Sequence, residues 1–299
     1  MLILFTPYTY LFLSLYFLVL LSIFSIRNFL IFWLFIEILI LLFIGVAYTQ
    51  FIHSYSQLIT YFLFQTLGSF SILVIYLFGF KRLVIFRLFF KLGMFPFYSW
   101  YINVLYRFPS FILFLARTFH KLPPLYIFYL LVEERDIRLL LLGSLLTVLV
   151  SSIFIFYIYD LRYMLIVSSI GNNAFILLAV LTGSVFVFSL FYIIYRFTVF
   201  LLLSSFSSLT RHSYSFSLKF YSFGVFLLLL LLNLGSFPPF PGFISKFLVF
   251  WIRFSIYSEY ASLFLLLIFI NVLIMLSYVR VLLKYLTNVY SNQSSLILF

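Results

Sequence analysis

The chain has 299 residues, of which 66% are apolar and 8% are charged, and its mean hydropathy is +1.28. Soluble domains are roughly 45–50% apolar and about 25% charged, so this chain has too few polar side chains to cover a surface that faces water. The composition excludes a soluble enzyme. Because a membrane span needs about 20 apolar residues, residues 1–299 are predicted to form one polytopic membrane domain of about ten helices.

The charged and sulfur-containing residues restrict the possible functions further. Cysteine is absent, which excludes thiolate-held metals and iron–sulfur clusters. The 18 Lys and Arg against 6 Asp and Glu give a net charge of +12. Because the basic residues are scattered along an apolar chain, they indicate anchoring among phospholipid headgroups and not nucleic-acid binding. The three histidines are dispersed, which argues against haem, so we expect no cofactor and no metal.

The residue usage also bears on where the chain is made. Phe and Tyr are abundant, with 46 and 24 residues, whereas Gly and Pro number 10 and 8. Since Leu, Ile and Phe are close to interchangeable against lipid, a T- and A-rich organellar genome can drift this way at little structural cost. No basic residue precedes Arg27, so the basic region of a secretory signal and an Arg-rich transit peptide are both missing. We expect a protein encoded in an organelle and inserted there.

Charges and turn residues divide the sequence into ten predicted spans, interpreted as helices because lipid tolerates only helices and closed barrels. Period-two alternation is not sustained, which argues against a barrel. The spans cover 4–24, 28–47, 57–80, 83–105, 109–131, 139–158, 163–182, 184–209, 220–252 and 260–283. With alternating spans, six basic residues flank the membrane on each side, so their distribution gives no orientation.

Two of these spans contain helix breakers. The fourth contains Gly93 and Pro96, and the ninth is interrupted by Gly235, Pro238, Pro239 and Pro241. Proline removes a backbone donor and clashes with the preceding turn. Broken helices are tolerated at membrane depth only where they are buried in protein or line a wet cavity. Both spans are therefore predicted to be discontinuous helices beside an ion path.

Glu37 lies in the middle of the second predicted span, too far from either end to reach water. A charge there costs about 2.5–3.5 kcal/mol on insertion scales, so it needs a cationic partner. Lys91, which is also central and adjoins a helix break, is the natural candidate. The pair is interpreted as part of a proton path, with a static buried ion pair as the alternative.

Three lysines share one setting. Each lies in mid-span within five residues of a proline: Lys91 before Pro96, Lys121 before Pro123 and Lys246 after Pro241. Burial can bring a lysine to titrate near neutral pH, whereas an arginine stays protonated. These lysines are therefore predicted to relay protons, the alternative being structural pairing.

The stretches that end in Lys91 and Lys121 both read Arg-x-Phe-x-Lys-Leu, beginning at Arg87 and Arg117. Like charges at i and i+4 lie on one helix face and repel each other. Arg87 and Arg117 are possible auxiliaries that favour proton release from the lysines, or they extend to the lipid headgroups, which suits Arg87 better. His120 is a third possible auxiliary, or else a packed side chain.

At these residues the chain resembles the subunit 2 family of mitochondrial NADH:ubiquinone oxidoreductase, complex I. The resemblance runs in the family's order over about 210 residues, from Glu37 to Lys246. Its carriers are Tyr61-Phe62-Leu63, Gln65-Thr66, Lys91-Leu92-Gly93-Met94-Phe95-Pro96-Phe97, Trp100, Lys121-Leu122-Pro123-Pro124, Leu161-Arg162, Ser168-Ser169-Ile170 and Gly235-Ser236-Phe237-Pro238-Pro239-Phe240-Pro241-Gly242-Phe243.

The resemblance implies an all-α, antiporter-like fold with inverted helix-bundle repeats, two discontinuous helices and a buried hydrophilic axis. By it, Glu37 and Lys91 are the coupled ion pair, Lys121 is the connecting lysine and Lys246 is the terminal lysine. It also implies a place in the mitochondrial inner membrane. The implied partners are subunits 4L and 4, the lateral helix of subunit 5, and phospholipids.

The function expected from this reading is proton translocation by a subunit without redox centres, coupled to electron transfer from NADH to ubiquinone in neighbouring subunits. The chain would be part of an enzyme and not catalytic alone. A self-standing cation/proton antiporter of the same fold is the alternative. A third possibility is an assembly bundle whose charges are static pairs.

Overall fold

The computed structural model describes residues 7–26, 28–50, 55–131, 136–158, 160–209, 219–238, 240–256 and 265–280. The regular structure in these ranges is helical, and they contain no strand. Contacts group the chain into two compact units, Met1–Gly143 and Ser144–Phe299. That both units act as the one domain predicted over 1–299 stays a prediction.

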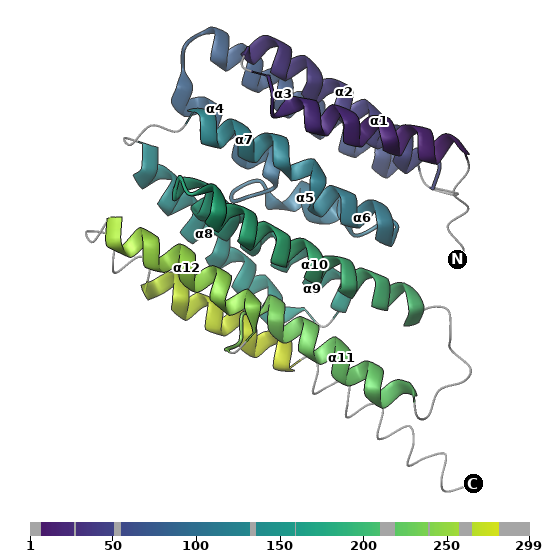
Figure 1. Cartoon of the computed structure of the whole chain (residues 1–299), viewed down its shortest axis with the longest axis vertical. Helices are drawn as coiled ribbons and strands as arrows, with labels where there is room; N and C mark the ends of the chain where they lie inside the picture. The colour runs from purple at the N-terminus through teal and green to yellow at the C-terminus, as the bar shows by residue number, and fades with distance from the viewer. Residues whose placement is uncertain are drawn as a thin grey trace, which may run out of the picture. The chain divides into compact units, whose positions relative to one another are not determined.

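Unit 1 begins with long helices that pack in sequence order. The first three helices and α4 are consecutive neighbours, and α7 packs on α4 (Figure 1). The elements are α1 (Pro7–Ile23), α2 (Phe29–Tyr48), α3 (Ser56–Leu77), α4 (Lys81–Leu92), α5 (Tyr98–Leu105), α6 (Ser110–Arg117), the 3₁₀ helix η1 (Phe119–Lys121) and α7 (Leu122–Leu131).

Unit 2 is organised around a buried helix. Every side chain from Met164 to Val180 on α9 is buried, and α10 and α12 both pack on this helix. The elements are α8 (Ile137–Tyr157), which starts in unit 1, α9 (Leu161–Leu181), α10 (Val185–Leu209), α11 (Lys219–Leu234), α12 (Pro241–Ile256) and a further helix over Leu265–Arg280.

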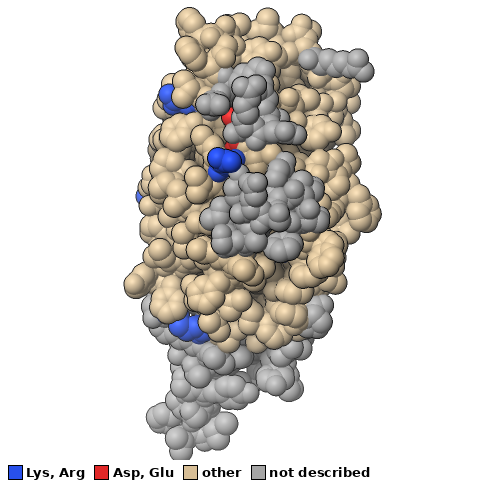
Figure 2. Space-filling model, turned by 90° about the vertical axis from the view of Figure 1, so that its left-hand side faces the viewer, with Lys and Arg blue, Asp and Glu red and all other residues tan. Residues whose placement is uncertain are grey.

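Within the described residues, five helices are long and apolar enough to cross a membrane: Phe29–Tyr48, Ser56–Leu77, Ile137–Tyr157, Arg162–Leu181 and Val185–Ser205. Most of their exposed positions are apolar, such as Leu34 and Leu41 on α2, which are 52% and 57% exposed. Figure 2 shows that uncharged side chains cover nearly all of the described surface on that face. A surface of this kind is stable against lipid and not against water.

The helices stop at both predicted breaks. α4 ends at Leu92, Gly93 has a left-handed φ of 67°, and α5 starts at Tyr98. A Cβ on Gly93 would lie 2.5 Å from Tyr101 Cγ, so the turn requires glycine. α11 ends at Leu234 and α12 starts at Pro241, while Pro239 lies outside the described residues. That each pair of helices is one discontinuous span stays a prediction.

A third interruption was not predicted. The sequence suggested one helix over 109–131, whereas the structure has α6, η1 and α7 in its place. The reason is Pro123-Pro124, because a proline cannot donate to the carbonyl four residues earlier and its ring clashes with that carbonyl. In the first turn of α7 these donors have no partner within the helix anyway, so both prolines are tolerated there. The break falls just upstream and contains His120 and Lys121.

Candidate functional site

Glu37 is attached to the neighbouring helix α3 through a serine. The Ser69 hydroxyl donates a hydrogen bond to Glu37 Oε1, and the Trp33 indole donates to the Ser69 carbonyl at 2.9 Å. Glu37 itself is half-buried, whereas Ser69 is buried. The acid therefore has a fixed place on α2, facing α3.

Lys91 lies in the last turn of α4 and is 4% exposed. The Gln65 amide donates to the Lys91 backbone carbonyl at 3.4 Å, and the Lys91 amine has no hydrogen-bond partner among the described residues. A cation in the last helical turn is stabilised by the helix dipole. Lys91 is thus a buried amine that is held through its backbone.

Glu37 and Lys91 are brought near each other without touching. Ser69 contacts the acid and Gln65 contacts the lysine, and these two residues are one turn apart on the same face of α3. The described residues contain no ion pair between Glu37 and Lys91. Sequence analysis missed the role of Ser69. The detectable signal was the run Tyr61, Gln65, Ser69, which places a polar group on every turn of an apolar helix.

His120 and Lys121 lie in η1, and both are 5% exposed. Aromatic rings surround His120, with Phe43 at 4.8 Å and Tyr61 at 5.8 Å between ring centroids. The Lys121 amine lies 4.8 Å from the centroid of the Tyr101 ring. A cation over an aromatic face is stabilised without an opposite charge.

Arg87, Arg117 and Arg196, which lie within predicted spans, have different surroundings. Arg117, at the end of α6, is 1% exposed, and its Nε and Nη2 atoms have no hydrogen-bond partner in the part of the chain that the structure describes. Arg87 is exposed although Lys91 is buried, so the structure does not bring Arg87 to the buried amine. Arg196 is half-buried, with its guanidinium 5.3 Å from the Tyr192 ring.

Lys246 belongs to unit 2 and lies on α12, shortly after the break between α11 and α12. It is 5% exposed, and its amine donates a hydrogen bond to Asn271 Oδ1 at 2.8 Å. The amine also lies 4.4 Å from the centroid of the Phe175 ring. Lys246 is therefore held by an amide and an aromatic face.

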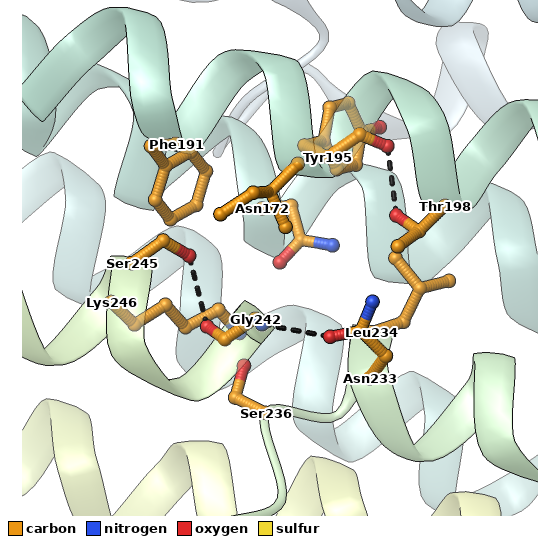
Figure 3. A pocket seen from close by; sticks show the side chains of 11 residues that line it. Asn172, Phe191, Tyr195, Thr198, Asn233, Leu234, Ser236, Gly242, Ser245 and Lys246 are labelled. Atoms are coloured by element: carbon orange, nitrogen blue, oxygen red, sulfur yellow. Dashed lines mark hydrogen bonds between the residues drawn. The ribbon is translucent and has the colours of Figure 1, made fainter. Parts of the chain in front are cut away.

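A small pocket lies beside Lys246 (Figure 3). Its volume is about 20 Å³, and one water molecule needs roughly 10–15 Å³ on this measure. Lys246 is the only charged residue in the lining, which consists of Asn172, Phe191, Ile194, Tyr195, Thr198, Asn233, Leu234, Ser236, Gly242, Ser245 and Lys246. A buried amine beside a cavity large enough for one water molecule can exchange a proton with that water.

Asn233 joins the two helices that flank this break. Its Oδ1 accepts a hydrogen bond from the Gly242 backbone amide at 2.7 Å, drawn in Figure 3. The bond satisfies a donor in the first turn of α12 that has no partner within the helix. Sequence analysis named Gly235 and the prolines here but not Asn233. A lone amide at the end of an apolar run was the available signal.

Buried ionisable side chains beside helix ends are a common feature of ion pathways in membrane proteins. Within the described residues, no group of three or more His, Asp or Glu could hold a metal ion. The model of one family, NADH:quinone oxidoreductase/Mrp antiporter, TM, matches residues 75–276. The chain belongs to this family, and the matched range includes Lys91, Lys121 and Lys246 but not Glu37.

Solved structures show the same fold. A chain of respiratory complex I from Thermus thermophilus with bound aureothin has a TM-score of 0.78 at 19% identity, over 93% of this chain and 70% of that one. A chain of the Mrp complex from Dietzia sp. DQ12-45-1b has a TM-score of 0.70 at 14% identity, and the match covers 84% of this chain and 55% of that one. A chain of the membrane-bound sulfane sulfur reductase, an archaeal respiratory membrane complex, has a TM-score of 0.69 at 17% identity, and the match covers 84% of this chain and 61% of that one. No curated protein sequence matches the chain.

Proposed function

We propose that the chain is the subunit 2 component of respiratory NADH:ubiquinone oxidoreductase and takes part in proton translocation without a redox centre of its own. One observation carries the proposal: three buried lysines, Lys91, Lys121 and Lys246, each lie beside a helix end. A charge inside a membrane costs about 2.5–3.5 kcal/mol, and residues that bear this cost usually serve an ion path. Family membership supports the same conclusion.

In this proposal protons pass between the buried groups one charge at a time. Ser69 and Gln65 on one face of α3 contact Glu37 of α2 and the Lys91 backbone of α4. In the proposal, His120 and Lys121 continue the path in unit 1. Lys246, beside its pocket, is the last residue of the proposed relay that binds and releases a proton. Moving one charge against 100 mV costs about 2.3 kcal/mol, so quinone reduction in neighbouring subunits has to drive the relay.

The proposal includes a location and partners. The apolar exposed surface supports a multi-pass protein that contacts phospholipid. Residue usage favours organellar encoding and the mitochondrial inner membrane. Subunits 4L and 4 and the lateral helix of subunit 5 are the proposed neighbours, and some of the structurally similar chains are parts of respiratory complexes.

The test compares Lys91→Gln with Arg87→Gln in the assembled complex in proteoliposomes. Both changes remove one positive charge from α4, but Lys91 is buried and Arg87 is exposed. We expect Lys91→Gln to lower the number of protons translocated per NADH, while Arg87→Gln leaves that number unchanged. Unaltered translocation in an assembled Lys91→Gln complex would contradict the proposal.

A self-standing cation/proton antiporter is the second candidate, favoured by the structural similarity to the Mrp complex. It predicts that the purified chain alone exchanges cations for protons in liposomes. The first proposal instead predicts that the chain co-purifies in mild detergent with a large NADH-oxidising assembly. Protein masses in that preparation, together with the exchange assay, separate the two.

A further inference from the structure

Lys246 has neutral neighbours on all the described helices that contact it. α9 contributes Asn172 and Phe175, α11 contributes Asn233, and the helix over Leu265–Arg280 contributes Asn271. From α10 the titratable group is Tyr195. No carboxylate lines the pocket, and Lys246 makes no ion pair within the described ranges.

The direct partner of the amine is an amide, which can act in two ways. An amide carries an acceptor oxygen and two N–H donors, whereas a carboxylate can only accept. The oxygen of Asn271 accepts from a charged ammonium, as observed at 2.8 Å. It also accepts from a neutral amine, and after rotation the amide nitrogen can donate to the amine's lone pair. The pair therefore keeps a hydrogen bond in both protonation states.

A carboxylate at the same place would behave differently. A buried opposite charge favours the ammonium form and opposes loss of its proton. An apolar side chain would leave the ammonium with one fewer hydrogen bond in a site where Lys246 is 5% exposed. Among these side chains, the amide alone stays bonded to the amine without locking its charge.

We propose that Asn271 is a positioning residue that keeps the Lys246 amine in place in both protonation states and so permits repeated proton uptake and release. The inference rests on the proposed function, since it assigns a partner to the last station of that relay. Asn271 lies 25 positions from Lys246 and outside every motif used to recognise the family.

The experiment uses the assembled complex in proteoliposomes with Asn271→Asp, Asn271→Leu, Asn271→Gln and Lys246→Gln. Protons translocated per NADH are measured across a pH series, with uncoupled NADH oxidation as the control for assembly. We expect Asn271→Asp to lower translocation at neutral pH about tenfold and to move the alkaline limb of the profile to higher pH, since a carboxylate beside the amine favours its protonated form. Asn271→Leu should move the profile toward acid pH, and Asn271→Gln should leave it near that of the unsubstituted complex.

The outcomes distinguish failure of the role proposed for Asn271 from failure of the proton-relay function proposed for Lys246. If Lys246→Gln leaves translocation intact, Lys246 is not a relay station, and the proposed function fails at this residue. If Lys246→Gln lowers translocation while Asn271→Asp and Asn271→Leu keep the original pH profile, Asn271 only fills space and the inference is overturned. Should Asn271→Asp fail to assemble, the Leu and Gln variants decide: a shift in Leu alone supports the inference, and equal profiles refute it.

Discussion

Replacing Gly242 with alanine tests whether the break between α11 and α12 is as tight as the structure has it. A Cβ at this position would collide with the backbone carbonyl oxygen of Asn233 and lie 2.8 Å from its Oδ1. The added methyl group must push the end of α11 away from the start of α12. The displacement also breaks the 2.7 Å hydrogen bond from the Gly242 amide.

The magnitude follows from three contributions. Overpacking costs about 1–3 kcal/mol, and the lost hydrogen bond costs about 1 kcal/mol. Alanine regains up to about 1 kcal/mol through its higher helix propensity. The net destabilisation is about 1–3 kcal/mol, and the shift reaches Lys246, which lies one helical turn further along α12.

The assay is thermal unfolding of the purified complex together with protons translocated per NADH. Gly68→Ala is the matched control, because the nearest atoms to a Cβ there are side-chain atoms at ordinary van der Waals distance, the Phe90 ring at 3.4 Å and Lys91 Cβ at 3.8 Å. We expect the Gly242 variant to melt below both the control and the original complex and to translocate fewer protons. Equal melting temperatures and equal translocation in the two variants would refute the close approach.

Three further predictions concern unit 1. Ser69→Ala should lower translocation by about tenfold, since a hydrogen bond to a charged group contributes about 1.5–3 kcal/mol, whereas Ser71→Ala on the same helix, whose hydroxyl bonds only within α3, should not. Arg117→Met should leave thermal stability unchanged or raise it by about 1–4 kcal/mol, because it removes a buried charge with two unbonded nitrogens; a clear drop in melting temperature would contradict this. Gly93→Ala should destabilise more than Gly79→Ala, since both glycines have positive φ but a Cβ meets a tyrosine ring only at Gly93; equal losses on thermal unfolding would show that the ring gives way.

The sequence could predict features that depend on residues close together along the chain. Long apolar stretches marked the helices of the membrane domain, and glycine and proline marked the ends of α4 and α11. The third break was not predicted, although the sequence contains Pro123-Pro124. A proline can interrupt a helix or lie in the first turn of one, and the sequence alone does not distinguish these two positions. Local rules therefore identified breakers without fixing every boundary.

Pairings between distant residues could not be predicted. Ser69 meets Glu37 across 32 positions and Asn271 meets Lys246 across 25, and no periodicity within one helix connects such pairs. Single serines and asparagines in apolar helices are common, because their side chains can bond to the helix's own carbonyls, as Ser71 does. Only the packing of helices shows which of them face a charged group.

The partners of the buried lysines also bear on the possibility that these charges are static pairs. A static pair would place an amine against a carboxylate, since a buried ion is stabilised mainly by direct contact with its opposite. In the described residues neither Lys91 nor Lys246 has such a contact: the Lys91 amine has no hydrogen-bond partner, and the Lys246 amine bonds to an amide. Neutral surroundings stabilise an ammonium less than a carboxylate does, and they leave the amine able to change its charge. The contacts around these lysines therefore favour a relay over an assembly scaffold.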